Sequence, residues 1–289
     1  NQPKFIILAV ILSLNVGVTV VVSHRRGEDD REAANRCLSQ AWMISCMVSF
    51  VLSTLGFIFA KQVVTLAGAT NEYVDMATIY FRSIMVGNFF YSMSLTINAA
   101  QKGAGNTKIA MKTNLTANIV NLIFNFLLIN GIGFFPKLGV LGAGIATSLG
   151  NFVAFVMSVI SISDSERFLH IRRKQKWRFD KKTLSDLYKI ASSAFAEQIF
   201  LRIGFFAYSK TVATLGMVAF ATHNVCMNLM NISFSFGDGL SVATSSLVGQ
   251  SLGARRKDLA IIYSKATQRL GNVCGICLGI VMITFRSQL

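Results

Sequence analysis

The sequence predicts an all-α polytopic membrane protein whose helices form a two-lobe, pseudo-symmetric bundle. Three observations predict this class. First, 53% of the 289 residues are hydrophobic and only 14% are charged, whereas soluble domains carry roughly 25% charged residues. Second, long apolar segments recur along the chain without the period-two alternation of membrane strands. Third, Lys and Arg gather in alternate connections between these segments, as the positive-inside rule requires.

Eight apolar segments are each long enough to cross the hydrocarbon of a bilayer as a helix, which takes roughly 20 residues. We expect these helices at residues 5–23, 41–60, 76–99, 112–132, 138–163, 186–212, 217–248 and 259–285. The first segment is not a signal peptide, because the Ser23-His24-Arg25-Arg26 stretch that follows it is not a cleavage site of small residues. Because the chain starts with Asn1 rather than Met, we expect it to be part of a longer protein.

The distribution of basic residues predicts the orientation. The connections after the first, third, fifth and seventh segments hold four, three, eight and three Lys or Arg residues, and the alternate connections hold only Lys61 and Lys137. Cytoplasmic loops carry this excess. We therefore expect a multi-pass protein of the plasma (inner) membrane, with loops 24–40, 101–111, 164–185 and 249–258 in the cytoplasm. Topology explains much of the net charge of +15, so we expect the lipid bilayer and no nucleic acid as a partner.

An internal repeat divides the chain. The stretch around Ser23, Gly27 and Arg31 resembles the stretch around Gly249, Gly253 and Lys257, always 226 residues later. Both stretches form the inner end of a predicted helix, six helices apart, which is typical of parallel repeats. We expect an N-terminal lobe over 1–163 with its first helix missing, a basic cytoplasmic linker over 164–185, and a C-terminal lobe over 186–289 with its last three helices missing. The complete protein would have six helices in each lobe.

Two predicted helices carry polar residues along one face. In the fourth helix these are Asn114, Asn118, Asn121 and Asn125, and in the seventh they are Asn224, Asn228, Asn231, Ser235 and Asp238. The spacings of three, four and seven residues put each set on one side of its helix. A single Asn in a membrane is usually an interhelical contact. A row of four or five polar residues instead indicates the wall of an aqueous cavity. The two rows lie in different lobes.

Charged groups inside a membrane segment are costly and are therefore candidates for function. Glu197 lies near the middle of the sixth predicted helix, with Gln198 and Arg202 close by. Glu197 and Arg202 are about 140° apart around the helix, so we interpret Glu197 as facing a cavity and Arg202 as a structural charge. Asp238 lies between two glycines. Either the helix breaks there and exposes carbonyl groups to a cavity, or Asp238 pairs with Arg255 or Arg256.

Several motifs together resemble one known family. They are Lys102-Gly103-Ala104-Gly105-Asn106-Thr107-Lys108, Asn121 to Asn125, the run from Phe135 to Thr147, and Leu247-Val248-Gly249-Gln250-Ser251-Leu252-Gly253-Ala254. In this order they resemble the multidrug and toxic compound extrusion (MATE) family of cation-coupled antiporters. The resemblance covers nearly the whole chain and maps it onto helices 2 to 9 of twelve. Lys102, Asn106 and Ser193 depart from the residues that are usual in that family.

The resemblance implies secondary transport and no enzymatic activity. It implies export of an organic, cationic small molecule by antiport with H⁺ or Na⁺, through alternating access of the two lobes, in a monomer without a cofactor. We expect the cation and substrate sites to include Asn118, Asn121, Asn125, Thr147, Glu197, Asn228, Asn231 and Asp238. The resemblance places a possible Na⁺ near Asn121, Asn125 and Thr147. Two alternatives remain open: a lipid-linked oligosaccharide flippase of similar fold, and a membrane scaffold that transports nothing.

Overall fold

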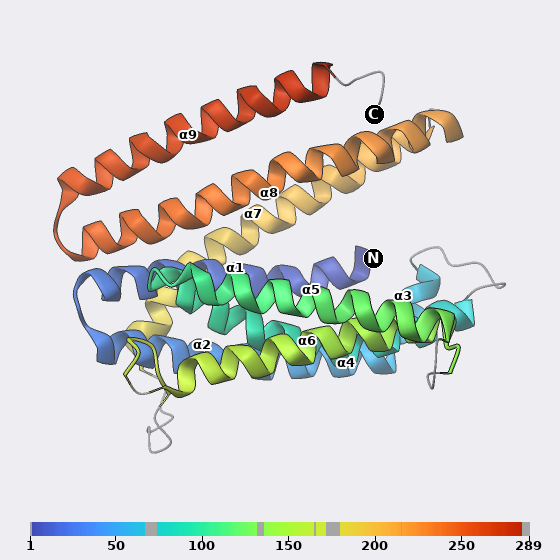
Figure 1. Ribbon diagram of the computed structural model, residues 1–289, viewed down its shortest axis with the longest axis horizontal. Coiled ribbons are helices and arrows are strands. Elements are labelled where there is room, and N and C mark those ends of the chain that lie inside the picture. Colours follow the sequence, from blue (N-terminus) through green and yellow to red (C-terminus); the bar gives the residue numbers. More distant parts are fainter. Residues whose placement is uncertain are drawn as a thin grey trace.

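The computed structural model describes residues 2–66, 74–131, 136–164, 166–171, 180–214 and 216–284, and in these ranges every regular element is a helix. The helices run along the long axis of the molecule (Figure 1). They are α1 (Gln2–Gly27), α2 (Arg31–Ile58), α3 (Ala60–Leu66), α4 (Val74–Gly103), α5 (Thr107–Asn130), α6 (Gly139–Ser163), α7 (Lys181–Thr214), α8 (Met217–Gly253) and α9 (Lys257–Thr284).

Eight of these helices correspond to the eight predicted segments, but several are longer than predicted. The start of α2 is Arg31 instead of residue 41, and the start of α7 is Lys181 instead of residue 186. The extra turns are polar, so apolar length did not reveal them. Asp30 accepts a hydrogen bond from the Ala33 amide at 2.9 Å and caps α2. The short helix α3 was not expected at all.

Four of the described helices are long and apolar enough to cross a membrane when length and composition alone are considered. They are α2, α6, α7 as far as Val212, and α9. The other four long helices, α1, α4, α5 and α8, are not among them, and α5 and α8 are the two that carry the asparagine rows. Amide side chains lower the mean hydropathy of both helices. A span that borders a polar site is expected to show this feature.

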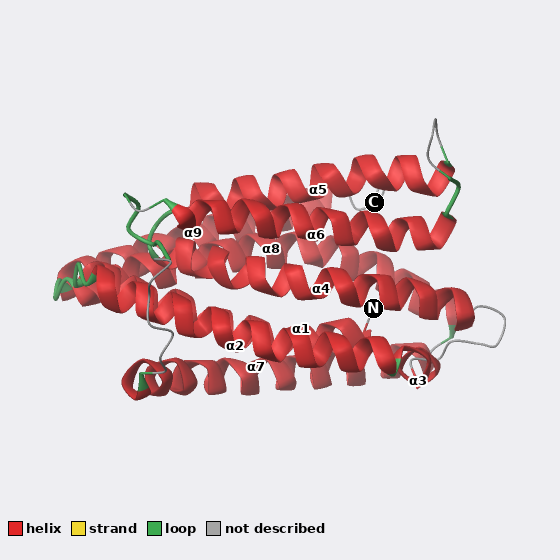
Figure 2. Cartoon of the chain, turned by 90° about the horizontal axis from the view of Figure 1, so that it is seen from below, coloured by secondary structure: helices red, strands yellow, loops and turns green. Residues whose placement is uncertain are grey.

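The connections between helices sort into two ends of the bundle. The turns α1–α2, α4–α5 and α8–α9 and the segment after α6 lie together at one end, and the turns α2–α3, α5–α6 and α7–α8 lie at the other (Figure 1). We call the first the basic end, because it carries the loops rich in Lys and Arg. Viewed from a perpendicular direction, α5 and α6 lie on one side and α7 on the other, with α1, α2 and α4 between them (Figure 2).

The buried apolar core is concentrated toward the basic end and includes residues from most of the helices. Its largest fully buried members include Leu38, Ile97 and Leu187, from α2, α4 and α7. Farther along, α5 and α6 pack closely at Gly142 and Gly150 of α6. A Cβ added at Gly142 would lie 2.7 Å from the Leu128 carbonyl oxygen, so the two backbones nearly touch there.

Three turns at the basic end have the same hydrogen bonds. After α1, the amides of Glu28 and Asp30 donate to the carbonyls of His24 and Arg25 at 3.0 Å. The corresponding bonds after α8, 226 residues later, measure 3.0 and 2.9 Å, and those after α4 measure 2.9 and 2.8 Å. Each turn also has a left-handed residue at the same position. These residues are Asp29, Gly105 and Arg255, with φ values of 55°, 86° and 58°. The structure therefore contains the predicted repeat and a third copy that the sequence comparison missed.

The two predicted repeats also contact each other reciprocally. A Cβ added at Gly27 would lie 2.0 Å from the Gln250 carbonyl oxygen, and one added at Gly253 would lie 2.1 Å from the His24 carbonyl oxygen. Because Gly27 is equivalent to Gly253 and His24 to Gln250, each repeat touches its partner in the same way. Such reciprocity is the property of an interface with local two-fold symmetry. We call this contact between residues 23–27 and 246–253 the α1–α8 junction.

Candidate substrate and cation sites

The first candidate site lies between α5 and α6. Asn125 Nδ2 donates to Asn121 Oδ1 at 3.0 Å, Asn121 Nδ2 donates to Thr147 Oγ1 at 3.1 Å, and the Thr147 hydroxyl donates to the Ala143 carbonyl at 2.9 Å. Within this chain, the bond from Asn121 to Thr147 joins α5 to α6, and the other two bonds lie within one helix. The Asn125 Oδ1 atom is buried and accepts no hydrogen bond from the part of the protein that the structure describes.

An acceptor oxygen in this position is able to take a cation or a water, because amide oxygens are ligands for hard cations and a buried polar atom without a partner is unfavourable. The structure thus brings together Asn121, Asn125 and Thr147. Asn118, three residues before the next amide of the row, is exposed and takes no part in this chain of bonds. The row therefore contributes one amide, Asn121, to interhelical contact, and one buried acceptor, Asn125 Oδ1, without a hydrogen-bond partner among the described residues.

The second candidate site is the polar face of α8. Asn228 and Asn231 precede Ser246 and Gly249 by 18 residues, which is about five whole turns. Ser246 and Gly249 belong to the α1–α8 junction, so the two asparagines are on the same face of α8, farther from the basic end. Both are exposed, as is Asp238. The side chain of Asn224 lies outside the described residues.

The structure corrects one prediction for Asp238. We expected that the flanking glycines would break the helix or that Asp238 would pair with Arg255 or Arg256. Instead, α8 is continuous from Met217 to Gly253, and Arg256 pairs with Asp258 at 3.4 Å. The glycines weaken helix propensity, but the long helix on either side maintains the backbone hydrogen bonds. Asp238 precedes Gly249 by 11 residues, which places it about 20° from the junction face.

Glu197 lies in the middle of α7, the helix that packs along α1. Leu187 and Ala191 of α7 face Gly17 of α1, since a Cβ at Gly17 would lie 3.2 Å from the Leu187 carbonyl oxygen. Gln198 follows Leu187 by 11 residues and shares its face, whereas Glu197 and Arg202 flank that face on opposite sides. Glu197 is exposed and forms no ion pair among the described residues, so the structure does not pair it with Arg202.

Polar side chains at the α1–α8 junction were not among the predicted site residues. Ser246 donates to the Lys102 carbonyl at 2.8 Å, and Gln250 Nε2 donates to the Gly103 carbonyl at 2.9 Å. Ser23 donates to the Ser245 carbonyl at 3.4 Å. These bonds join the ends of α1, α4 and α8. The glycine and glutamine of the repeated motif had signalled the position, but not the contact between the two copies.

The two candidate sites remain separate in the fold. The main packing partner of α5 is α6, with a smaller contact to α4, whereas those of α8 are α1 and α9, with smaller contacts to α7 and α4. Among the described residues no cluster of three His, Cys, Asp or Glu is arranged to hold a metal ion. Cys274 and Cys277 are free. The chemistry that these sites offer is reversible binding by amide oxygens and carboxylates.

Comparison with known proteins identifies what the chain is similar to. A family model described as MatE matches residues 1–127 and 194–289. A protein from Thermotoga maritima, described as a probable multidrug resistance protein NorM, is 24% identical over 292 residues, which include 100% of this chain and 62% of the relative. The uncharacterized transporter YisQ of Bacillus subtilis is also 24% identical, over 96% of this chain and 60% of its own length. The chain thus spans about three fifths of these relatives.

Solved structures share the fold. An outward-facing multidrug resistance MATE family transporter of the MOP superfamily superposes with a TM-score of 0.89 at 19% identity, over 98% of this chain and 62% of that protein. A MOP superfamily transporter from Pyrococcus furiosus gives the same TM-score, identity and coverage. At this level of identity the similarity establishes the fold alone, and it confirms the predicted class of helical membrane protein.

Proposed function

Because the chain belongs to the MatE family, we propose that it is part of a secondary transporter that exports organic cations in exchange for H⁺ or Na⁺. Substrate and coupling cation would occupy the polar sites of the two lobes at different times. The protein would act as a monomer in the plasma membrane and would catalyse no covalent chemistry. The names of the relatives, several of which are multidrug resistance proteins, support export of toxic compounds as the direction of transport.

The observation that carries this proposal is the relation between the α1–α8 junction and the polar face of α8. The two helices touch at the basic end and diverge toward the other end (Figure 1). Asn228, Asn231 and Asp238 are on the junction face of α8, beyond the point of contact. A polar face that continues outward from a closed junction is the arrangement expected of a transporter closed on one side of the membrane.

The cation would act by competition. A carboxylate in a poorly solvated site can be neutralised by a proton, and an organic cation stabilises its ionised form. Glu197 is the acidic residue in the middle of α7 and forms no ion pair among the described residues. We therefore assign it as the main protonatable group of the C-terminal lobe. Asn121, Asn125 and Thr147 would form the cation-binding group of the N-terminal lobe, through the Asn125 Oδ1 atom.

Glu197→Gln tests this assignment, because the amide preserves size and hydrogen-bonding capacity but removes the charge. Binding of a monovalent cationic dye to the protein in proteoliposomes should be measured across a pH range. We expect the variant to bind more weakly at high pH, where the wild-type carboxylate is ionised. At low pH, where the wild-type group is already neutral, the two proteins should bind alike.

Loss of the pH dependence in the variant supports Glu197 as the coupling group. A variant that retains both the affinity and the pH dependence of the wild type would make Glu197 structural and would shift the assignment to Asp238. Glu166→Gln provides a matched control, because Glu166 lies in the basic linker, outside every candidate site.

A further inference from the structure

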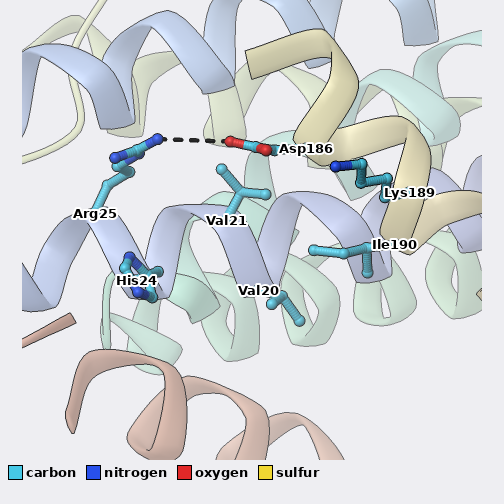
Figure 3. Close-up of a pocket in the computed structure, with 7 residues that line it drawn as sticks. All are labelled: Val20, Val21, His24, Arg25, Asp186, Lys189 and Ile190. Carbon is cyan, nitrogen blue, oxygen red and sulfur yellow. Dashed lines mark ion pairs between the residues drawn. The ribbon is translucent and has the colours of Figure 1, made fainter. Parts of the chain in front are cut away.

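A cavity of about 300 Å³ lies between α1 and α7 at the basic end, away from the candidate transport sites. Val20, Val21, His24 and Arg25 line it from α1, and Asp186, Lys189 and Ile190 line it from α7. Three of these side chains are apolar and four are polar or charged. Figure 3 shows Arg25 and Asp186 facing each other across the gap, with Lys189 on the same side as Asp186.

The charged groups of the cavity retain unused binding capacity. Arg25 Nη1 donates to Glu28 Oε2 at 2.8 Å, and this hydrogen bond raises the pKa of the Arg25 guanidinium. Arg25 Nη2 lies 3.6 Å from Asp186 Oδ2, which is too long for a hydrogen bond. Asp186 accepts no hydrogen bond from the described residues and is 38% exposed. Lys189 forms no ion pair with them.

The presence of both positive and negative side chains in the cavity restricts the class of ligand that it can bind. A purely anionic group on Arg25 and Lys189 would also face the carboxylate of Asp186, and a purely cationic group on Asp186 would face Arg25 and Lys189. A zwitterion resolves both conflicts, because its two opposite charges would meet two opposite sets of side chains. Charge-assisted hydrogen bonds of both signs would then form in one small cavity.

The position of the cavity in the molecule indicates which class of zwitterion it binds. It lies at the end of the molecule that carries the basic loops, which predicts the level of the inner-leaflet headgroups. Basic side chains between helices at this level bind the phosphates of lipid headgroups, and Arg25 and Lys189 are the basic side chains of this cavity. Val20, Val21 and Ile190 offer an apolar surface next to the charges, which suits the start of an acyl chain. These features favour a phospholipid over a soluble metabolite.

We propose that this cavity binds the headgroup of a phosphatidylethanolamine-type lipid. Lys189 and Arg25 hold its phosphate, Asp186 accepts hydrogen bonds from its primary ammonium, and Val20, Val21 and Ile190 contact the lipid chain. The ammonium is the selective element. Phosphatidylcholine has the same charges, but its quaternary nitrogen has no N–H to donate to Asp186. Phosphatidylglycerol has no cation at all.

The test is native mass spectrometry of the protein titrated with phosphatidylethanolamine, phosphatidylcholine and phosphatidylglycerol that have identical acyl chains. We expect phosphatidylethanolamine adducts to exceed the other two severalfold. Lys189→Gln should reduce the adducts of all three lipids, because it removes a phosphate contact. Asp186→Asn should abolish the preference for phosphatidylethanolamine over phosphatidylcholine. Soluble glycerophosphoethanolamine should displace the lipid poorly, because it lacks the acyl chains.

Lys265→Gln and Asp258→Asn provide matched controls. Lys265 is the ninth residue of α9, as Lys189 is of α7, and both are exposed. These controls should bind as the wild type does. Lys189→Arg and Asp186→Glu preserve the charges and should retain binding, which separates a loss of contact from misfolding. Equal binding of phosphatidylethanolamine and phosphatidylcholine, a preference for phosphatidylglycerol, or full displacement by the soluble headgroup would each overturn the proposal. None of these readouts depends on transport.

Discussion

At the scale of single residues, Asn125 is the side chain whose role the contacts define most sharply. Its amide nitrogen donates to Asn121, and its amide oxygen is buried without a hydrogen-bond partner among the described residues. A buried acceptor without a partner costs about 1–3 kcal/mol. A bound cation would satisfy the acceptor. The same row of asparagines that predicted a polar site thus contains residues in two different situations.

Asn125→Leu should therefore weaken Na⁺ binding by about tenfold, which corresponds to about 1.4 kcal/mol. Isothermal titration calorimetry with NaCl, against choline chloride as the reference salt, provides the measurement. Asn130→Leu is the control, because Asn130 is exposed at the end of α5 and bonds only locally, to the Phe126 carbonyl. Unchanged Na⁺ affinity in Asn125→Leu would mean that this amide serves only its hydrogen bond to Asn121 within α5.

At the scale of helices, the α1–α8 junction depends on backbone contact that tolerates no side chain. A Cβ added at any of three glycines would meet an atom of the other helix. The distances would be 2.0 Å at Gly27, 1.9 Å at Gly249 and 2.1 Å at Gly253. Even one methyl group must push the two helices apart. Since the polar face of α8 continues from this contact, the junction sets how α8 is placed relative to α1.

Gly253→Ala should destabilise the protein by about 1–3 kcal/mol, as overpacking does, and should open the basic end. Thermal unfolding in detergent measures the first effect, and labelling of a cysteine introduced at Ser246 measures the second. Gly275→Ala in α9 is the control, because a Cβ added there meets no atom of another described element within 4 Å. That variant should gain about 1 kcal/mol from helix propensity. Equal stability of the two variants would contradict the tight contact.

At the scale of the whole molecule, the described parts of the basic loops lie at one end although they are far apart in sequence (Figure 1). Clustering alone does not orient the molecule in a membrane. The orientation remains a prediction of the positive-inside rule, and it determines on which side the α1–α8 junction closes. The proposed lipid site depends on the same orientation, since it lies at the same end.

Single-cysteine labelling in a cysteine-free background tests this orientation. A cysteine at Ser165, which lies outside the described residues, should not react with an impermeant maleimide in intact cells, but should react after permeabilisation. A cysteine at Lys137, at the opposite end, should react in both. Rapid labelling at Ser165 in intact cells would reverse the orientation and would move the basic end outside.

The sequence by itself determined the class of fold, the number of long helices and the positions of two of the three repeated turns. Apolar length, the alternation of basic loops and the glycine motifs are local properties, and a linear pattern records them fully. The sequence did not predict the polar ends of α2 and α7 or the short helix α3. Apolar length marks only the part of a helix that crosses hydrocarbon. The row from Asn114 to Asn125 was visible in the sequence, but not the difference between its members.

Only the tertiary structure decided which polar residues meet. Asn121 bonds to Thr147 across 26 residues, and Gln250 bonds to the Gly103 carbonyl across 147. Such contacts depend on how helices pack, and the packing follows from close backbone approach at a few glycines. The continuity of α8 at Asp238 was likewise decided by the helix as a whole, because its hydrogen-bonded turns on both sides outweigh the weak propensity of two glycines.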